Sequence, residues 1–151
     1  MTQYRVLKRA QQYFERQERR CALGVAACER QVREGEAKLA ELERYRGVYM
    51  RDFDLRAREG MNATRARTYQ AFLVRIAQAV HEQRELLARA STQHQEELRR
   101  WQAAVRRRLA LNRILERHEL EEDSREEKTQ QAAADAHAQR LWILRGVRRG
   151  H

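Results

Sequence analysis

The stretch "EGMNATRARTYQAFLVRIAQAV", residues 59–80, interrupts a chain that is otherwise rich in helix-forming residues and then restarts it. Gly60 suits the end of a helix because glycine tolerates a positive φ angle. Asn62 or Thr64 suits the N-cap of a following helix, since its side-chain oxygen can accept a hydrogen bond from a free backbone N–H. The stretch therefore predicts one turn, at residues 60–64, between two helices.

The composition of the chain favours long helices. Its 151 residues include no proline, 36% charged residues and 7% aromatic residues. Ala, Leu, Glu, Gln and Arg dominate, and these are among the strongest helix formers. Such a composition is typical of long helices or coiled coils rather than of a compact globule. We therefore expect an all-α protein with a first helix at residues 4–59 and a second at residues 65–120 or longer.

Apolar residues recur on both sides of the turn at the three- and four-residue spacing of a coiled coil. A short connection between two such helices favours an antiparallel hairpin. Folding the chain about residue 61 makes the numbers of facing residues sum to about 122, which places Cys21 opposite Trp101 and Gly24 opposite Leu98. Small residues then face large ones. The expected seam comprises Cys21, Gly24, Cys28, Leu42, Tyr49, Leu73, Val80, Leu98 and Trp101.

The second helix is expected to extend past the start of the first. Residues 1–151 then form a single elongated helical hairpin, in which residues 121–151 overhang with no partner in the same chain. The overhang carries the apolar cluster "LWIL" at residues 141–144. The sequence leaves open whether this cluster is disordered or covered by a partner.

The net charge is +10, and 29 of the 32 basic residues are arginines. The positive charge indicates either a solvated helix surface or attraction to an acidic protein, a membrane surface or nucleic acid. The aromatic residues are not interleaved with the basic ones as stacking platforms for nucleic acid would be, so we expect no nucleic-acid partner. No apolar run is long enough for a signal peptide or a transmembrane helix, and we expect a cytoplasmic protein without direct membrane insertion.

The chain lacks the motifs of an enzyme. A Walker A loop is missing, and Cys21 and Cys28 lack the spacing of zinc or redox sites. These two cysteines stand seven residues apart on one helix face, about 10 Å, which is too far for a disulfide, so we expect free thiols. A two-helix hairpin encloses no substrate cavity. We therefore expect no catalytic, cofactor-binding or metal-binding residue.

A second apolar stripe lies beside the predicted seam of the second helix. On a helical wheel with about 100° per residue, the combined apolar arc spans roughly 120°, wider than one partner helix covers. Part of it is then exposed and is a candidate surface for binding a protein. The alternative is that the stripe packs on the first helix around Tyr45 and Tyr49. Its residues are Phe72, Ile76, Ala79 and Gln83.

Three segments in order, "LERYRGVYMRDF", "GMNATR" and "YQAFLVRIAQAVHEQRELL", resemble the FliJ family of flagellar type III export proteins. The resemblance is best over residues 39–90. Residues 135–140, "DAHAQR", are weakly similar to a motif near the family's C-terminus, with His137 where phenylalanine is usual. The resemblance does not extend to the tail "LWILRGVRRGH".

The resemblance implies a coiled-coil stalk, not an enzyme, that binds the hexameric export ATPase FliI and the export gate protein FlhA, and in some members export chaperones. It also implies a cytoplasmic location beside the inner-membrane export apparatus. The family's gate contact falls on the stripe Phe72, Ile76, Ala79 and Gln83, although Gln83 replaces the histidine of some members. Two alternatives are the homologous stalk of a virulence secretion system and a basic coiled coil that binds nucleic acid.

Overall fold

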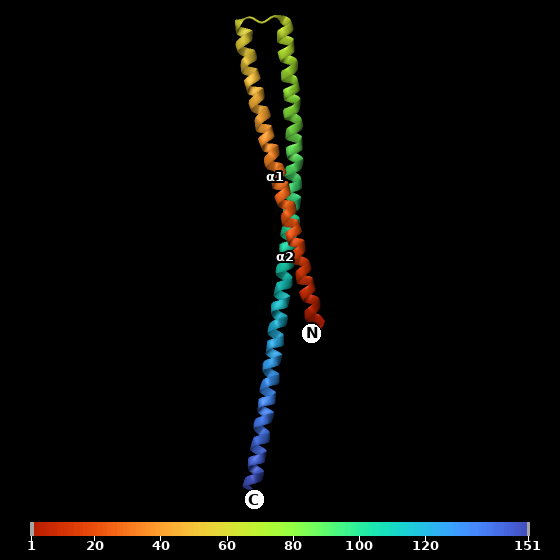
Figure 1. Cartoon of the computed structure of the whole chain (residues 1–151), viewed down its shortest axis with the longest axis vertical. Helices are drawn as coiled ribbons and strands as arrows, with labels where there is room; N and C mark the ends of the chain where they lie inside the picture. Colours follow the sequence, from red (N-terminus) through yellow and green to blue (C-terminus); the bar gives the residue numbers. More distant parts are fainter. Residues whose placement is uncertain (1, 151) are drawn as a thin grey trace. The chain divides into compact units, whose positions relative to one another are not determined.

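The computed structural model describes residues 2–150 and contains two long helices. Helix α1 spans Thr2–Glu59 and helix α2 spans Ala63–Arg149 (Figure 1). The prediction of an all-α fold built from two long helices is confirmed. The first helix begins two residues earlier than predicted, and the second continues without a break far beyond residue 120.

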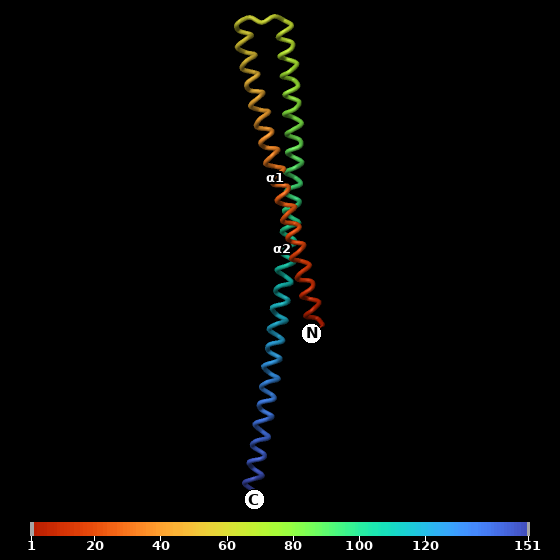
Figure 2. The backbone as a smooth tube through the Cα atoms, in the orientation of Figure 1, coloured from red at the N-terminus to blue at the C-terminus, as the bar shows by residue number. Residues whose placement is uncertain are grey.

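The turn between the helices is shorter than the predicted 60–64 and comprises residues 60–62 only (Figure 2). Gly60 has a φ of 100°, which a side chain would strain, and its N–H donates to the carbonyl of Ala57 at 3.3 Å. Asn62 caps α2, since its Oδ1 accepts a 2.8 Å hydrogen bond from the backbone N–H of Arg65. Thr64, the other candidate for the cap, lies inside α2.

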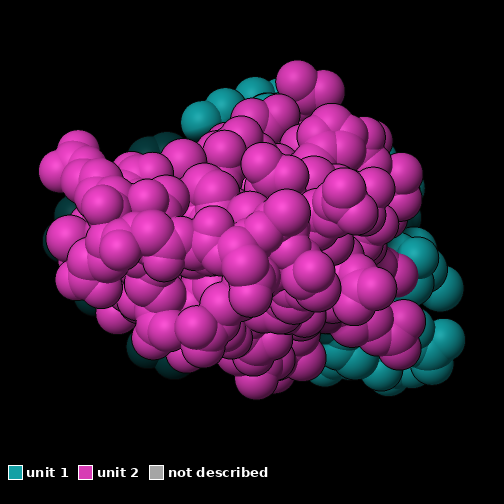
Figure 3. Space-filling view, turned by 90° about the horizontal axis from the view of Figure 1, so that it is seen from above, with its two compact units in different colours: residues 1–16, 106–151 teal, residues 17–105 magenta. Residues whose placement is uncertain are grey.

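Contacts group the chain into two compact units, distinguished by colour in Figure 3. One comprises residues 17–105, the turn and the helical arms on either side of it; we call it the turn unit. The other comprises the described residues up to 16 and from 106 onward; we call it the terminal unit. The expected single elongated hairpin domain stays a prediction.

In the turn unit the two arms run antiparallel with the register that the sequence predicts. The ring centroids of Phe53 and Tyr69 lie 5.8 Å apart, and these residue numbers sum to 122. A Cβ on Gly35 would lie 3.2 Å from Cδ1 of Leu87, a pair with the same sum. The predicted sum of about 122 is therefore confirmed at two positions along the paired helices of this unit.

The seam of the turn unit is narrow. Cys28 and Val80 are buried, and Val80 is only 1% exposed. The expected pairing of Gly24 with Leu98 stays a prediction; a Cβ on Gly24 would first meet Oε2 of Glu97, the neighbour of Leu98, at 2.8 Å. The long Glu97 side chain reaches over the small residue. The other seven expected seam residues are half-buried: Cys21, Gly24, Leu42, Tyr49, Leu73, Leu98 and Trp101.

In the terminal unit the first residues of α1 pack along α2. Leu111 and Leu115 of α2 are buried. Nε2 of Gln11 donates a 3.0 Å hydrogen bond to Oδ1 of Asn112. The described residues from 123 to 150 are all exposed, and α2 remains helical through residue 149 (Figure 2). Thus α2 extends past the start of α1, as predicted, and the cluster at residues 141–144 is part of a helix.

Candidate functional site

Five aromatic rings gather beside the turn, three from α1 and two from α2, and we call them the aromatic cluster. The closest pair is Tyr49 and Phe72, whose ring centroids lie 4.5 Å apart. Tyr45 contacts both of these rings, at 5.0 Å and 6.1 Å. Tilted and edge-to-face contacts of this kind add to the stability gained from burial. The members of the cluster are Tyr45, Tyr49, Phe53, Tyr69 and Phe72.

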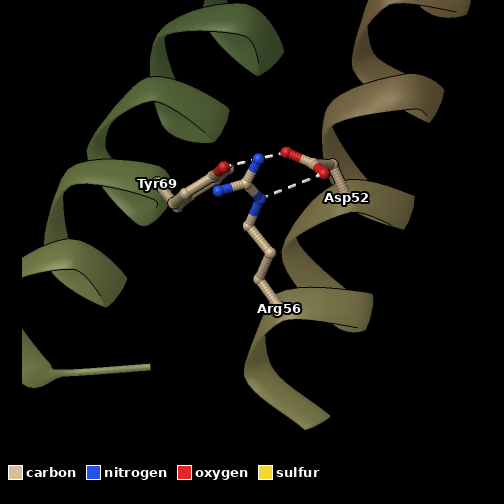
Figure 4. A network of polar contacts seen from close by, with 3 residues as sticks. All are labelled: Asp52, Arg56 and Tyr69. Carbon is tan, nitrogen blue, oxygen red and sulfur yellow. Dashed lines mark hydrogen bonds and ion pairs between the residues drawn. The ribbon is translucent and has the colours of Figure 1, made fainter. Parts of the chain in front are cut away.

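A polar network closes the cluster on the side toward the turn (Figure 4). The hydroxyl of Tyr69 on α2 donates to Oδ2 of Asp52 on α1 at 2.8 Å. Nε of Arg56 donates to Oδ1 of the same carboxylate at 3.3 Å. One carboxylate therefore joins the first turns of α2 to the last turns of α1.

The network shifts the pKa of each of its acidic groups. The hydrogen bond from Tyr69 lowers the pKa of Asp52, and the hydrogen bond and charge of Arg56 lower it further, while desolvation acts in the opposite sense. The same hydrogen bond raises the pKa of Tyr69. Within the cluster, a hydrogen bond with Tyr45 raises the pKa of Tyr49. Both tyrosines are therefore neutral near pH 7.

The predicted exposure of the second stripe is wrong for two of its four residues. Ile76 and Gln83 are buried, at 5% and 7% exposed. Nε2 of Gln83 donates to the backbone carbonyl of Gly35 at 3.3 Å, across the hairpin. An amide at this position reaches α1 because the glycine has no side chain in the way. These two residues belong to the packing between the helices.

The other two stripe residues, Phe72 and Ala79, are half-buried. Phe72 packs on Tyr45 and Tyr49, as the alternative interpretation of the stripe expected. The cluster nevertheless keeps accessible aromatic surface, since Tyr45 is 48% exposed. A shallow groove also runs along one side of Phe72, lined by Thr64, Arg67, Thr68, Ala71, Phe72 and Arg75.

This surface combines aromatic and cationic groups. Arg67 and Arg75 flank the groove beside Phe72. Aromatic residues and arginine are the side chains most enriched at the centres of protein interfaces. The arrangement can hold an apolar side chain of a partner against Phe72 and a carboxylate against the arginines.

Other candidate chemistry is sparse in the described part of the chain. Cys21 and Cys28 are free thiols, as predicted. Within residues 2–150 no group of three or more His, Cys, Asp or Glu side chains is arranged to hold a metal ion. Neither described helix contains a stretch with both the length and the apolar character needed to cross a bilayer.

Sequence reasoning missed the polar contacts between the helices. Arg84 donates to Glu43 at 2.9 Å, and Gln83 donates to Gly35, in addition to the bond between Tyr69 and Asp52. The predicted register could have indicated these pairs, because the residue numbers of each pair sum to between 118 and 127, close to the predicted sum of about 122. These polar residues lie outside the apolar columns from which the register was predicted.

The chain matches one family model, described as flagellar FliJ protein, over residues 5–146. No curated protein and no solved structure matches the chain. The matched region includes the turn unit and most of the terminal unit, with the aromatic cluster near its centre. The chain therefore belongs to the flagellar FliJ protein family, a family of flagellar export components.

Proposed function

We propose that this protein is the coiled-coil stalk of the flagellar export apparatus, and that it binds the export ATPase FliI and couples it to the export gate FlhA. The observation that carries the proposal is the family match over residues 5–146. The antiparallel pairing of two long helices is compatible with a stalk, since such a pair has little interior and a large lateral surface. The function is not enzymatic, and export chaperones are a further class of partner.

The gate contact is made by the accessible part of the aromatic cluster. Phe72 keeps exposed surface next to Tyr45, and such aromatic surface is expected at an interface centre. Ala79 is half-buried two turns further along α2. The buried residues Ile76 and Gln83 lie beneath this surface. They hold α2 against α1 and so fix the position of Phe72.

The proposed location is the cytoplasm beside the inner-membrane export apparatus, where both partners are reached. The family description names the flagellar system, which favours it over a virulence secretion system. Deleting the gene in the source organism tests which of these two secretion systems requires the protein. Loss of motility that is restored by the intact gene supports the flagellar assignment.

A pull-down with the tagged full chain from flagellated cells of the source species tests the proposal. The intact protein should recover both the ATPase and the gate protein. Phe72→Ala should weaken gate recovery by roughly thirtyfold in affinity, the effect of losing an aromatic anchor worth about 2 kcal/mol. It should leave ATPase recovery unchanged.

The matched control is Val74→Ala, because Val74 lies two residues away on α2 and is 57% exposed. It should recover both partners as the intact protein does. Helicity and melting temperature are measured for each variant, since Phe72 also packs on Tyr49. If Phe72→Ala retains full gate recovery while folded, the gate does not bind the aromatic cluster.

A further inference from the structure

The end of α2 carries an exposed apolar cluster within a strongly basic segment. Between residues 136 and 150 the sequence has four arginines and neither Asp nor Glu. Its large apolar side chains are between 44% and 76% exposed, and Trp142 is the most exposed of them. They are Leu141, Trp142, Ile143, Leu144 and Val147. We call residues 136–150 the basic end segment.

The basic end segment is amphipathic. On a helical wheel with about 100° per residue, Ile143, Leu144 and Val147 fall within an arc of roughly 100°. Arg145, Arg148 and Arg149 fall in a separate arc of similar width on the opposite side. Trp142 lies between the two arcs. Leu141 and Arg140 depart from the pattern, with Leu141 among the arginines and Arg140 inside the apolar arc, between Val147 and Leu144.

This arrangement has the features of a helix that lies in the surface of a membrane. Such helices place arginines on one face and Trp, Leu or other apolar residues on the other. An indole suits the headgroup level, because its ring is apolar and its N–H is polar. The long side chain of Arg140 can extend from the apolar side to the headgroups. No described helix is suited to crossing the bilayer, so the binding is peripheral.

The positive charge of the basic end segment indicates which kind of partner it binds. Residues 119–127, earlier in α2, hold six acidic residues and one arginine, so an acidic stretch separates the basic end segment from the arginines at residues 99–117. We propose that the basic end segment binds the surface of membranes that contain anionic lipid, with Ile143, Leu144 and Val147 inserted and Arg145, Arg148 and Arg149 at the phosphates. This inference does not depend on the proposed contacts with the ATPase and the gate.

Co-sedimentation of the full chain with lipid vesicles tests this inference. One set of vesicles contains phosphatidylethanolamine and phosphatidylglycerol in equal amounts, and the other contains phosphatidylcholine alone. The protein should sediment with the anionic vesicles and remain in solution with the neutral ones. Added salt should weaken the binding, because it screens charges at the surface. The emission of Trp142 should shift to shorter wavelength on binding, and Trp142→Phe should abolish that shift.

Two triple variants separate the charged and apolar contributions. Replacing Arg145, Arg148 and Arg149 by Gln should weaken binding about a hundredfold, since each basic residue near an anionic surface contributes about fivefold. Replacing Ile143, Leu144 and Val147 by Ser should weaken it while keeping the charge. The control replaces three exposed arginines of α2 outside the segment by Gln, namely Arg106, Arg107 and Arg113. It has the same net charge as the first variant and should bind as the intact protein does.

Several results would overturn the inference. One is equal sedimentation of the intact protein and the arginine variant, and another is no sedimentation with anionic vesicles. Sedimentation equilibrium and a DNA titration are run in parallel. A dimer that requires Ile143, Leu144 and Val147 would assign the apolar face to a second copy of the chain. Binding to DNA that is stronger than binding to the vesicles would assign the arginines to nucleic acid.

Discussion

The hydroxyl of Tyr69 donates a 2.8 Å hydrogen bond to Asp52, and this bond joins α2 to α1 beside the turn. The bond lowers the pKa of Asp52 below its ordinary value of 3.8. A carboxylate with a lowered pKa stabilises the folded state above its ordinary pKa, and that stabilisation is lost as the pH falls through the lowered value. The network therefore contributes fully at neutral pH and disappears in strong acid.

Asp52→Asn should remove this pH dependence. The melting temperature of the intact protein, followed by circular dichroism from pH 7 to pH 2, should fall in the acid range partly through protonation of Asp52. The variant should melt lower at pH 7, and its difference from the intact protein should shrink toward pH 2. Asp54→Asn is the control, because Asp54 is exposed on the same helix. An equal effect of both variants would contradict a special role for Asp52.

Tyr69→Phe tests the same bond from the other helix. The bond raises the pKa of Tyr69 above 10.0, so the phenol stabilises the fold below pH 10 and this contribution is lost as the pH rises through the raised value. The variant should melt lower at pH 7 while its ring still packs on Phe53. Combining it with Asp52→Asn should cost less than the sum of the two single losses, because both changes affect the bond between Tyr69 and Asp52, while only Asp52→Asn also weakens the contact with Arg56. Fully additive losses would show that the two residues act independently.

Val80→Ala should be clearly destabilising, because Val80 is the most completely buried side chain among the residues described, at 1% exposed. Loss of its methyl groups from a packed seam should cost about 2 kcal/mol in the free energy of unfolding. Val74→Ala makes the same chemical change at an exposed site of the same helix and should cost less than about 0.5 kcal/mol. Urea titration of both variants measures the difference. Equal free energies would mean that the seam does not pass through Val80.

Two glycines of α1 should respond differently to alanine. Gly47→Ala should raise the free energy of unfolding by about 1 kcal/mol, since a Cβ there would meet only the end of the Arg51 side chain, at 3.9 Å. At Gly35 the new methyl would lie 3.2 Å from Leu87, so the gain in helix propensity is offset by crowding. A melting temperature that rises equally in both variants would show that the helices are not closely packed at Gly35.

The sequence predicted the main features of the fold because those features depend on local chemistry. Gly60 and Asn62 have the two properties that a turn between helices needs, a tolerated positive φ and a capping oxygen. The seven-residue spacing of the seam then fixed which faces meet. The register followed from these two facts, and the contact of Phe53 with Tyr69 agrees with it.

The candidate site was harder to predict, because exposure on a helical wheel depends on how the partner helix is shaped. Ile76 and Gln83 were expected at the surface but are buried, and Gln83 lies against Gly35 of α1, whose lack of a side chain lets the amide reach the backbone. A helical wheel of α2 alone carries no information about α1, such as the missing side chain of Gly35. The contact between α1 and α2 is also wider at the aromatic cluster, since Tyr45 and Tyr49 cover one side of Phe72.

A mixing experiment with three purified components tests whether the chain joins the export ATPase to the gate. The full chain, the export ATPase and the cytoplasmic domain of the gate protein are combined, and their masses are measured by size-exclusion chromatography with light scattering. If the chain is the stalk, one complex contains all three, and the ATPase and the gate domain do not associate when the chain is omitted. A chain that elutes alone in the presence of both partners would contradict its assignment as the stalk between them.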